Sequence, residues 1–412
     1  MSINASERQR SFVTLVISLF VAICSVSYLA YSNQIGFFFD TLHGNDSYTR
    51  AVRALEMLNS GEFYDTDLTR VYPPNGLEQH WTRFVDLMNI IGAIPLLPFM
   101  SVHSSFMIWA TVLPVLLMIP AYISIYYIGK PLMGSRGAQL VVALSTLYPI
   151  WYLQFSPGRI DQHSFVLIVM LALMALTINA VLNINSKKIG IFLGFTLALG
   201  IWISTEVILY TGGVVLSFGI VWFFGKKEIS RQAVFVFFAA TIFSILFIFI
   251  DRGYSSALIP TSELDRISFF YTGLFGICSL FFGFVTLSDK TKHFDFGEKD
   301  NGGGSYNISN VIIGIGVLYL YLNWLQPIVL SGGIVEVDDL YRELRTQYIL
   351  ELEPVWSKWL VRNFGIVPVF LNAFAYAFPF VVGTVGAILA LFYSNDEKKW
   401  GWIIPIAFAL LY

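Results

Sequence analysis

Long apolar segments separated by short polar ones dominate this sequence. Several reach the roughly 20 residues that an α-helix needs to cross the hydrocarbon core of a bilayer. The pattern predicts an all-α, polytopic membrane protein with about 11 spans. We expect these spans near residues 11–32, 104–128, 138–156, 163–184, 189–205, 207–224, 233–250, 267–287, 310–330, 364–393 and 400–412.

The two ends of the chain carry apolar runs that need interpretation. Residues 11–32 follow Arg8 and Arg10, as a signal peptide would. Their apolar core is longer than the roughly 7 to 15 residues of a signal peptide, and no clear cleavage site follows, so we expect an uncleaved span. The last run reaches Tyr412, which indicates either a fragment or a span that continues in a longer protein.

Two further segments have the pattern of helices that rest on the membrane surface. In residues 43–65, apolar side chains recur at helical spacing from Tyr48 to Leu58, and Gly61 follows as a stop signal. Residues 87–100 are apolar but short and contain two prolines. We therefore expect juxtamembrane helices here and no additional span.

Charge gives the orientation. With these spans, ten of the eleven lysines fall on one side together with the N-terminus. By the positive-inside rule that side is the cytoplasm, so the long loops 33–103 and 331–363 face outward. We expect a plasma membrane protein of bacterial inner-membrane type whose active site faces outward.

Composition excludes several classes of protein. The chain is 56% hydrophobic and 13% charged, unlike soluble domains. Cys24 and Cys278 lie inside apolar segments without metal spacing, so neither a disulfide framework nor a zinc site is expected. We find no basic stripe that would indicate nucleic-acid binding.

The charges that remain in the apolar regions gather on the outer side. Between Gly137 and Ser186 the only charged residues are Arg159 and Asp161, and His163 follows two positions later. These residues fall in a turn between two spans. A turn must be polar in any case, so a purely structural role is an equally good interpretation.

Other acidic residues on this side extend the candidate site. Asp46 precedes the first turn of the surface helix in the loop 33–103, where it could simply cap the helix by accepting a backbone N–H. Glu351 lies in the loop 331–363. Carboxylates from Asp46 and Asp161 with the imidazole of His163 favour a divalent cation, and the imidazole shifts the choice from Ca²⁺ or Mg²⁺ toward Mn²⁺. Such a cation would stabilise a departing phosphate.

Three more residues are candidates for binding substrate. Trp81 is suited to an interfacial anchor, and Arg83 could contact a lipid phosphate. Glu206 is the only charge between Lys188 and Lys226. It is either a functional group inside the membrane or part of a wet turn between two spans.

Three motifs resemble those of the GT-C class of membrane glycosyltransferases, in particular the single-subunit bacterial type of oligosaccharyltransferase catalytic subunit. Asn45-Asp46-Ser47-Tyr48 resembles the family's N-D-x-Y pattern, and Gly158 to His163 resembles its D-x-D motif with His163 in place of the second Asp. Residues 349–354 match the Glu and Pro of the S-V-S-E-x-x-P motif, but not its serines.

The resemblance implies a GT-C-like bundle, a polyprenyl-phosphate-linked sugar donor, a bound Mn²⁺ or Mg²⁺ and transfer with inversion. It assigns the metal to Asp46, Asp161 and His163, and the orientation of the acceptor to Asp46 and Glu351. We add a phosphate contact by Arg159.

One departure concerns the acceptor. The family's external C-terminal domain, with its W-W-D-Y-G motif, is absent from these 412 residues. The acceptor is therefore either protein asparagine or a lipid or glycan hydroxyl. Two other classes stay open, namely a membrane transporter or lipid flippase without glycosyl transfer, and a structural subunit of a larger assembly.

Overall fold

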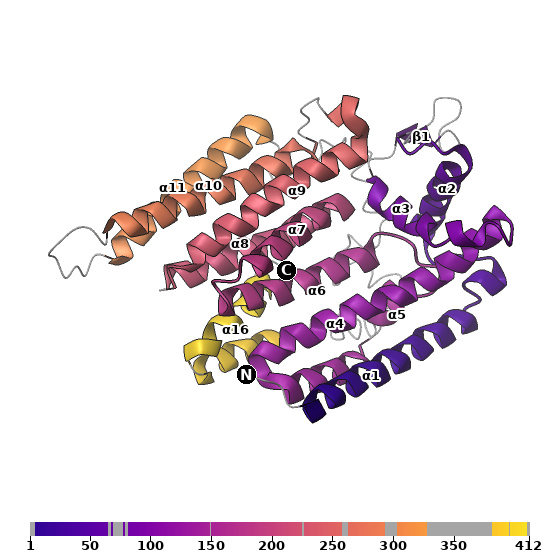
Figure 1. The fold of residues 1–412 in the computed structure, drawn as a ribbon, viewed down its shortest axis with the longest axis horizontal. Coiled ribbons are helices and arrows are strands. Elements are labelled where there is room, and N and C mark those ends of the chain that lie inside the picture. Colours follow the sequence, from indigo (N-terminus) through magenta and orange to yellow (C-terminus); the bar gives the residue numbers. More distant parts are fainter. Residues whose placement is uncertain are drawn as a thin grey trace, which may run out of the picture.

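The fold is built almost wholly from helices (Figure 1). The exception among the described residues is one antiparallel pair of two-residue strands, β1 (Asp67–Leu68) and β2 (Leu77–Glu78). The computed structural model describes residues 5–64, 67–68, 77–78, 81–148, 150–224, 226–257, 263–292, 303–327, 381–394 and 396–409.

The apolar segments form a row of helices, in which α1, α4, α6, α7, α9, α10 and α11 each contact the next (Figure 1). Helices α8 and α16 pack against this row through α6. The bundle helices are α1 (Ala5–Ser32), α4 (Val102–Ser145), α5 (Ile150–Phe155), α6 (His163–Leu182), α7 (Lys187–Ile203), α8 (Ile208–Phe223), α9 (Ile229–Ala257), α10 (Phe269–Lys292), α11 (Gly303–Leu325) and α16 (Asp396–Ala409).

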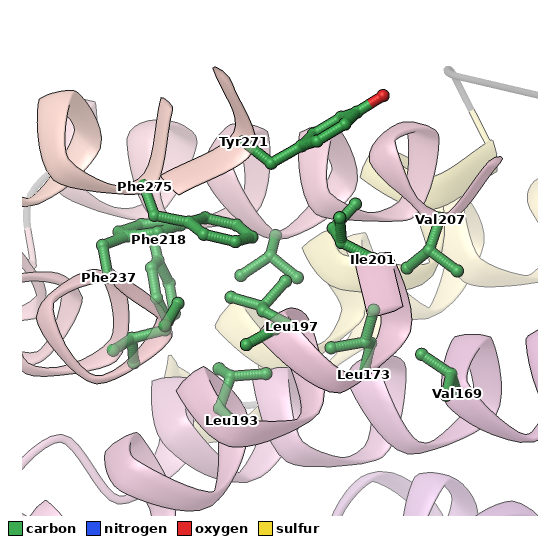
Figure 2. Close-up of a cluster of buried hydrophobic side chains, with 14 of the residues drawn as sticks. Val169, Leu173, Leu193, Leu197, Ile201, Val207, Phe218, Phe237, Tyr271 and Phe275 are labelled. Carbon is green, nitrogen blue, oxygen red and sulfur yellow. The ribbon is translucent and has the colours of Figure 1, made fainter. Parts of the chain in front are cut away.

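The main core lies where α7 packs between α6 and α9. Leu193, Leu197 and Ile201 of α7 are fully buried in it (Figure 2). A Cβ atom at Gly194 would lie 2.3 Å from the carbonyl oxygen of Val236, so glycine is required for the close approach of α7 to α9. Small residues at such contacts are typical of helices that associate within a membrane by van der Waals packing.

Helix α4 contains a reversal of the chain. Gly134 has non-helical angles, with φ 74° and ψ 178°. The Tyr122 hydroxyl hydrogen-bonds Thr146, and its ring centroid lies 4.7 Å from that of Trp151. A continuous helix would separate positions 122 and 146 by about 36 Å, at 1.5 Å per residue. The two halves are therefore antiparallel, as the predicted spans 104–128 and 138–156 require.

Helix lengths confirm the predicted class of an all-α polytopic membrane protein. In the described part of the chain, seven helices are long and apolar enough to cross a membrane. The predicted span 138–156 is interrupted between Ser145 and Ile150, and α7 has 17 residues. Of the predicted span 364–393, the structure describes only the apolar helix Val381–Tyr393. The total of about 11 spans remains a prediction.

The predicted surface helices are present at one end of the bundle, and neither adds a span (Figure 1). The first, α2 (Asn45–Ser60), ends at Gly61, whose N–H donates to the Met57 carbonyl. The second, α3, begins earlier than expected and is followed by a short 3-10 turn. The small elements at this end are η1 (Phe37–Phe39), α3 (Arg83–Ile91), η2 (Ile94–Leu96) and η3 (Thr205–Val207).

Candidate functional site

The segments that carry Asp46 and Asp161 lie against each other. The backbone N–H of His43 donates to the Gly158 carbonyl at 3.0 Å. The backbone N–H of Ile160 donates to the Ser47 hydroxyl at 3.2 Å. The segment around the start of α2 and the turn before α6 are thus joined by hydrogen bonds on both sides of Asp46 and of Arg159.

Gly158 makes this close approach possible. Its φ is +80°, a region that side chains rarely adopt. A Cβ atom there would lie 3.2 Å from Ile35 and 3.4 Å from the backbone of Leu42. Its own N–H donates to the Ala110 carbonyl at 3.1 Å, which anchors the turn to α4.

Asp46 lies in the first turn of α2, and its side chain is exposed. The residue at the cap position is Gly44, and no side chain in the described part of the chain provides a capping hydrogen bond at this terminus. The alternative role as a side-chain cap therefore finds no support in the geometry. A carboxylate in the first turn is still favoured by the partial positive charge of a helix N-terminus.

Asp161 is buried and held within its own turn. It is 3% exposed. One carboxylate oxygen lies 2.9 Å from Nε of Arg159, and the other accepts the backbone N–H of His163 at 3.0 Å. Arg159 also donates to the Leu153 carbonyl at 2.6 Å. These contacts stabilise the turn, which is the structural role considered above for its polar residues. They also fix the orientation of the Asp161 carboxylate.

His43 is a neighbour that the sequence analysis missed. Its Nδ1 atom is buried and has no hydrogen-bond partner among the described residues, and its ring centroid lies 5.7 Å from that of Tyr152. Burial, followed by the nearby Arg159 guanidinium, lowers the pKa of His43 below its ordinary value, while Asp161 acts in the opposite direction. The one signal in the sequence was the position of His43 three residues before Asp46.

This lowered pKa predicts a pH dependence of stability. Below the ordinary pKa of histidine the unfolded chain binds a proton that the folded chain binds less well, so acid destabilises the fold. We expect the melting temperature to fall between about pH 7.5 and 5, and to fall less steeply in His43→Gln. Thermal unfolding in detergent at several pH values measures this slope. Equal slopes in the two proteins would contradict the assignment.

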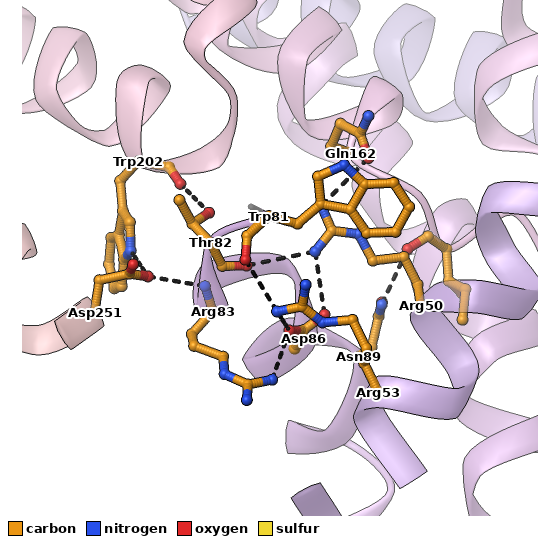
Figure 3. A network of polar contacts seen from close by, with 11 residues as sticks. Arg50, Arg53, Trp81, Thr82, Arg83, Asp86, Asn89, Gln162, Trp202 and Asp251 are labelled. Carbon is orange, nitrogen blue, oxygen red and sulfur yellow. Dashed lines mark hydrogen bonds and ion pairs between the residues drawn. The ribbon is translucent and has the colours of Figure 1, made fainter. Parts of the chain in front are cut away.

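A buried ionic cluster lies beside these segments and connects α2 to α3 (Figure 3). Asp86 of α3 is completely buried and pairs with Arg50 at 3.1 Å, Arg53 at 2.8 Å and Arg83 at 3.1 Å. We name these four residues the arginine cluster. All three arginines are at most 2% exposed. Burial lowers the pKa of Arg53 to about 10, so its guanidinium stays charged at neutral pH.

The arginine cluster is tied to the candidate site and to the bundle (Figure 3). Arg50 donates to the side chain of Gln162, next to Asp161, at 3.3 Å. The Asn89 side chain donates to the Ile160 carbonyl at 3.0 Å. The backbone N–H of Arg83 donates to Asp251 of α9 at 2.8 Å. The cluster therefore holds the surface helices and the Asp161 turn in one arrangement.

The remaining candidate residues differ in how far they are buried and in which groups they contact. Arg83, expected at a lipid phosphate, is buried against Asp86, because Asp86 offers it a partner of opposite charge. Trp81 is half-buried, and its ring centroid lies 4.2 Å from the Arg50 guanidinium carbon. Glu206 is exposed in the turn η3, at the start of a helix that is apolar enough to cross a membrane, so both interpretations of this residue stay open. Glu351 lies outside the described residues.

The described residues do not by themselves complete a metal site. The donor types are suitable for a hard divalent cation, since Asp46 and Asp161 offer carboxylates and His163 offers an imidazole. Within the described ranges, however, no three His, Cys, Asp or Glu side chains are grouped closely enough to hold an ion. Both oxygens of Asp161 already have partners. The described residues therefore do not fit the cation as they are arranged.

The fold is similar to solved structures of an archaeal oligosaccharyltransferase. Archaeoglobus fulgidus AglB in complex with an inhibitory peptide and a dolichol-phosphate aligns with 99% of this chain and 50% of its own, with a TM-score of 0.63 and 14% identity. The Archaeoglobus fulgidus enzyme in complex with Zn and sulfate covers 96% of this chain and 48% of its own, at a TM-score of 0.60 and 14% identity.

The same enzyme tethered to an acceptor peptide with the NVT sequon covers 97% of this chain and 49% of its own, at a TM-score of 0.59 and 15% identity. No protein-family model and no curated protein matches the sequence. The chain spans about half the length of these solved proteins. The resemblance found in three short motifs thus extends to the architecture, and the chain shares the fold of the archaeal oligosaccharyltransferase.

Proposed function

We propose that this chain is a membrane glycosyltransferase of oligosaccharyltransferase type. It transfers a sugar or oligosaccharide from a polyprenyl-phosphate-linked donor to a protein, lipid or glycan acceptor at the outer face of the membrane. The proposal is supported by the shared fold, and by solved complexes of the similar enzyme with dolichol-phosphate and with an acceptor peptide.

The observation that carries the proposal is the hydrogen-bonded pairing of the Asp46 segment with the Asp161 segment. His43 donates to Gly158, and Ile160 donates to Ser47. These bonds bring together two acidic motifs that are more than a hundred residues apart in the sequence. A purely structural polar turn would not require an exposed carboxylate on the neighbouring segment.

The reaction is a single displacement with inversion. The nucleophile of the acceptor attacks the anomeric carbon, the bond from that carbon to the phosphate oxygen breaks, and the nucleophile loses a proton. Asp46, which is exposed, would orient the acceptor and receive this proton together with Glu351. Arg159 would contact the phosphate that leaves, because a guanidinium binds phosphate with two parallel hydrogen bonds.

The other candidate residues receive more distant roles. Arg83 belongs to the arginine cluster, and Trp81 contacts it through Arg50. We assign both residues to holding the substrate-facing turn in place. Glu206, exposed in its turn, is assigned to the rim of the same face. These roles distinguish residues that touch the substrate from residues that position others.

Cation dependence is a separate prediction. Asp46, Asp161 and His163 lack a complete donor set among the described residues, so a Mn²⁺ or Mg²⁺ site requires a ligand from elsewhere, such as Glu351. If such a ligand completes the site, EDTA should reduce transfer by at least about tenfold, because a bound cation would stabilise the charge on the leaving phosphate. Activity should return with Mn²⁺ or Mg²⁺. Full activity in excess EDTA would reject the requirement for a cation but would not affect the transferase proposal.

The proposed activity can be tested without knowing the sugar. Lipid-linked sugars and cell-envelope acceptors are extracted from cells that lack this gene and incubated with the purified full chain in detergent. Mass spectrometry then measures the polyprenyl phosphate released and the glycosylated product. A flippase or a structural subunit would form neither, so the absence of both in extracts shown to contain the donor would reject the transferase proposal.

A further inference from the structure

A groove of about 490 Å³ lies between α1 and the first half of α4, at the end of the bundle opposite to the candidate site. Ser11 and Phe12 of α1 line one side, and Ile123 and Tyr126 of α4 line the other. Its volume is within the roughly 300 to 1,000 Å³ typical of small-molecule sites. It lies where α1 enters its apolar stretch.

The polar end of the groove is positively charged. Arg8 and Lys130 both line it, and no described lining residue is acidic. The Lys130 ammonium lies 5.5 Å from the ring centroid of Tyr126 and 5.8 Å from that of Tyr127, so cation–π contacts restrict its position. The Ser11 hydroxyl accepts a hydrogen bond from Gln139 at 2.8 Å, which leaves its own O–H available as a donor.

The rest of the groove is apolar and faces outward from the bundle. Phe12 is 66% exposed and Ile123 is 40% exposed, and Leu15 lies beside them. Both helices are long and apolar enough to span a membrane. Side chains that are exposed on such helices face hydrocarbon chains, and basic residues near helix ends lie at the level of the lipid headgroups.

We propose that this groove binds an anionic glycerophospholipid. The phosphate would lie between Arg8 and Lys130, with the Ser11 hydroxyl as an additional donor, and an acyl chain would follow Phe12 and Leu15. The groove and the lipid match in charge and polarity along their lengths. Arg8 and Lys130 at one end would face the phosphate, and the apolar remainder would face an acyl chain. The site is independent of the proposed glycosyl transfer.

Native mass spectrometry of the full chain in detergent tests this site. The protein is titrated with phosphatidylglycerol and with phosphatidylcholine that carry the same acyl chains. We expect one phosphatidylglycerol to be retained at least about tenfold more tightly than phosphatidylcholine, and Lys130→Gln or Arg8→Gln to lose most of this preference, because each removes a charge-assisted contact.

Lys187→Gln is the matched control. Lys187 lies 5.4 Å from the ring centroid of Phe235 near the same end of the bundle, but it does not line the groove. Its replacement should leave the preference unchanged. Equal retention of the two lipids by the wild-type chain, or an unchanged preference in both groove variants, would overturn the proposal. Displacement of the lipid by excess inorganic phosphate would indicate a general anion site, and it would also reject the proposed lipid site.

Discussion

Replacement of Asp46 by alanine is expected to lower the rate of glycosyl transfer by at least about a hundredfold, the usual contribution of a group that moves a proton. The chain should still fold and insert, because Asp46 is exposed and makes no capping hydrogen bond. The loss of its favourable position at a helix N-terminus costs only about 0.3 to 1 kcal/mol. Product formation from the lipid-linked donor, measured beside the melting temperature, separates the two effects.

Asp40→Asn provides the matched control for Asp46→Ala, because asparagine tolerates the positive φ of 53° at this position. Asp40 is also an exposed aspartate at this end of the bundle, and it pairs with the exposed His103 at 2.6 Å. Removal of this surface pair should leave both transfer and stability nearly unchanged. Wild-type turnover in Asp46→Ala would show that the exposed carboxylate has no part in the chemistry.

Asp161 is a less direct test of catalysis. Its carboxylate pairs with Arg159 and accepts the His163 N–H, so Asp161→Asn changes the turn as well as the charge. A loss of activity in this variant would combine the two effects. Asp46 therefore distinguishes chemistry from structure more clearly.

The largest expected effect on stability is that of Asp86→Asn. The substitution keeps the shape of the side chain but leaves three buried guanidinium groups without their carboxylate. Removing one partner of a buried ionic group costs about 3 to 5 kcal/mol. We expect a large fall in the melting temperature in detergent, together with easier proteolysis between α2 and α3.

A double variant tests the electrostatic cause. Arg53→Gln removes one of the positive charges that Asp86 compensates, so Arg53→Gln combined with Asp86→Asn should be less destabilised than the sum of the single variants. Asp40→Asn, at an exposed pair, is the control and should have little effect. Additive effects of the two single variants, or an effect of Asp86→Asn no larger than that of the control, would contradict the role of the arginine cluster.

The helices could be predicted because the bilayer requires long apolar segments, and the sequence contains them. Residues 163–184 and 207–224 were expected as spans, and α6 and α8 occupy them. The stop at Gly61 was also correct, because only a residue that tolerates positive φ ends a helix in this way. Asp161 was found from its charge within apolar surroundings, and Asp46 from its position at the start of an amphipathic helix.

The orientation of α2 could not be predicted in the same way. Its apolar residues at helical spacing predicted a side that rests on the membrane. Tyr48 is 47% exposed, but Leu55 and Leu58 pack against a core cluster. The opposite side buries Arg50 and Arg53, which sequence reasoning leaves in solvent because isolated arginines are seldom buried. Their burial depends on Asp86, a residue of another helix.

The sequence alone determined which segments form long apolar helices, because this follows from local hydrophobicity, and its charges and motifs gave the acidic candidate residues. Only the tertiary structure decided that the His43 segment bonds to the Gly158 turn, that Arg83 pairs with Asp86, and that Asp161 is held by Arg159. Such pairings depend on long-range packing. The free energy of burying a charge is set by partners that the neighbouring sequence does not contain.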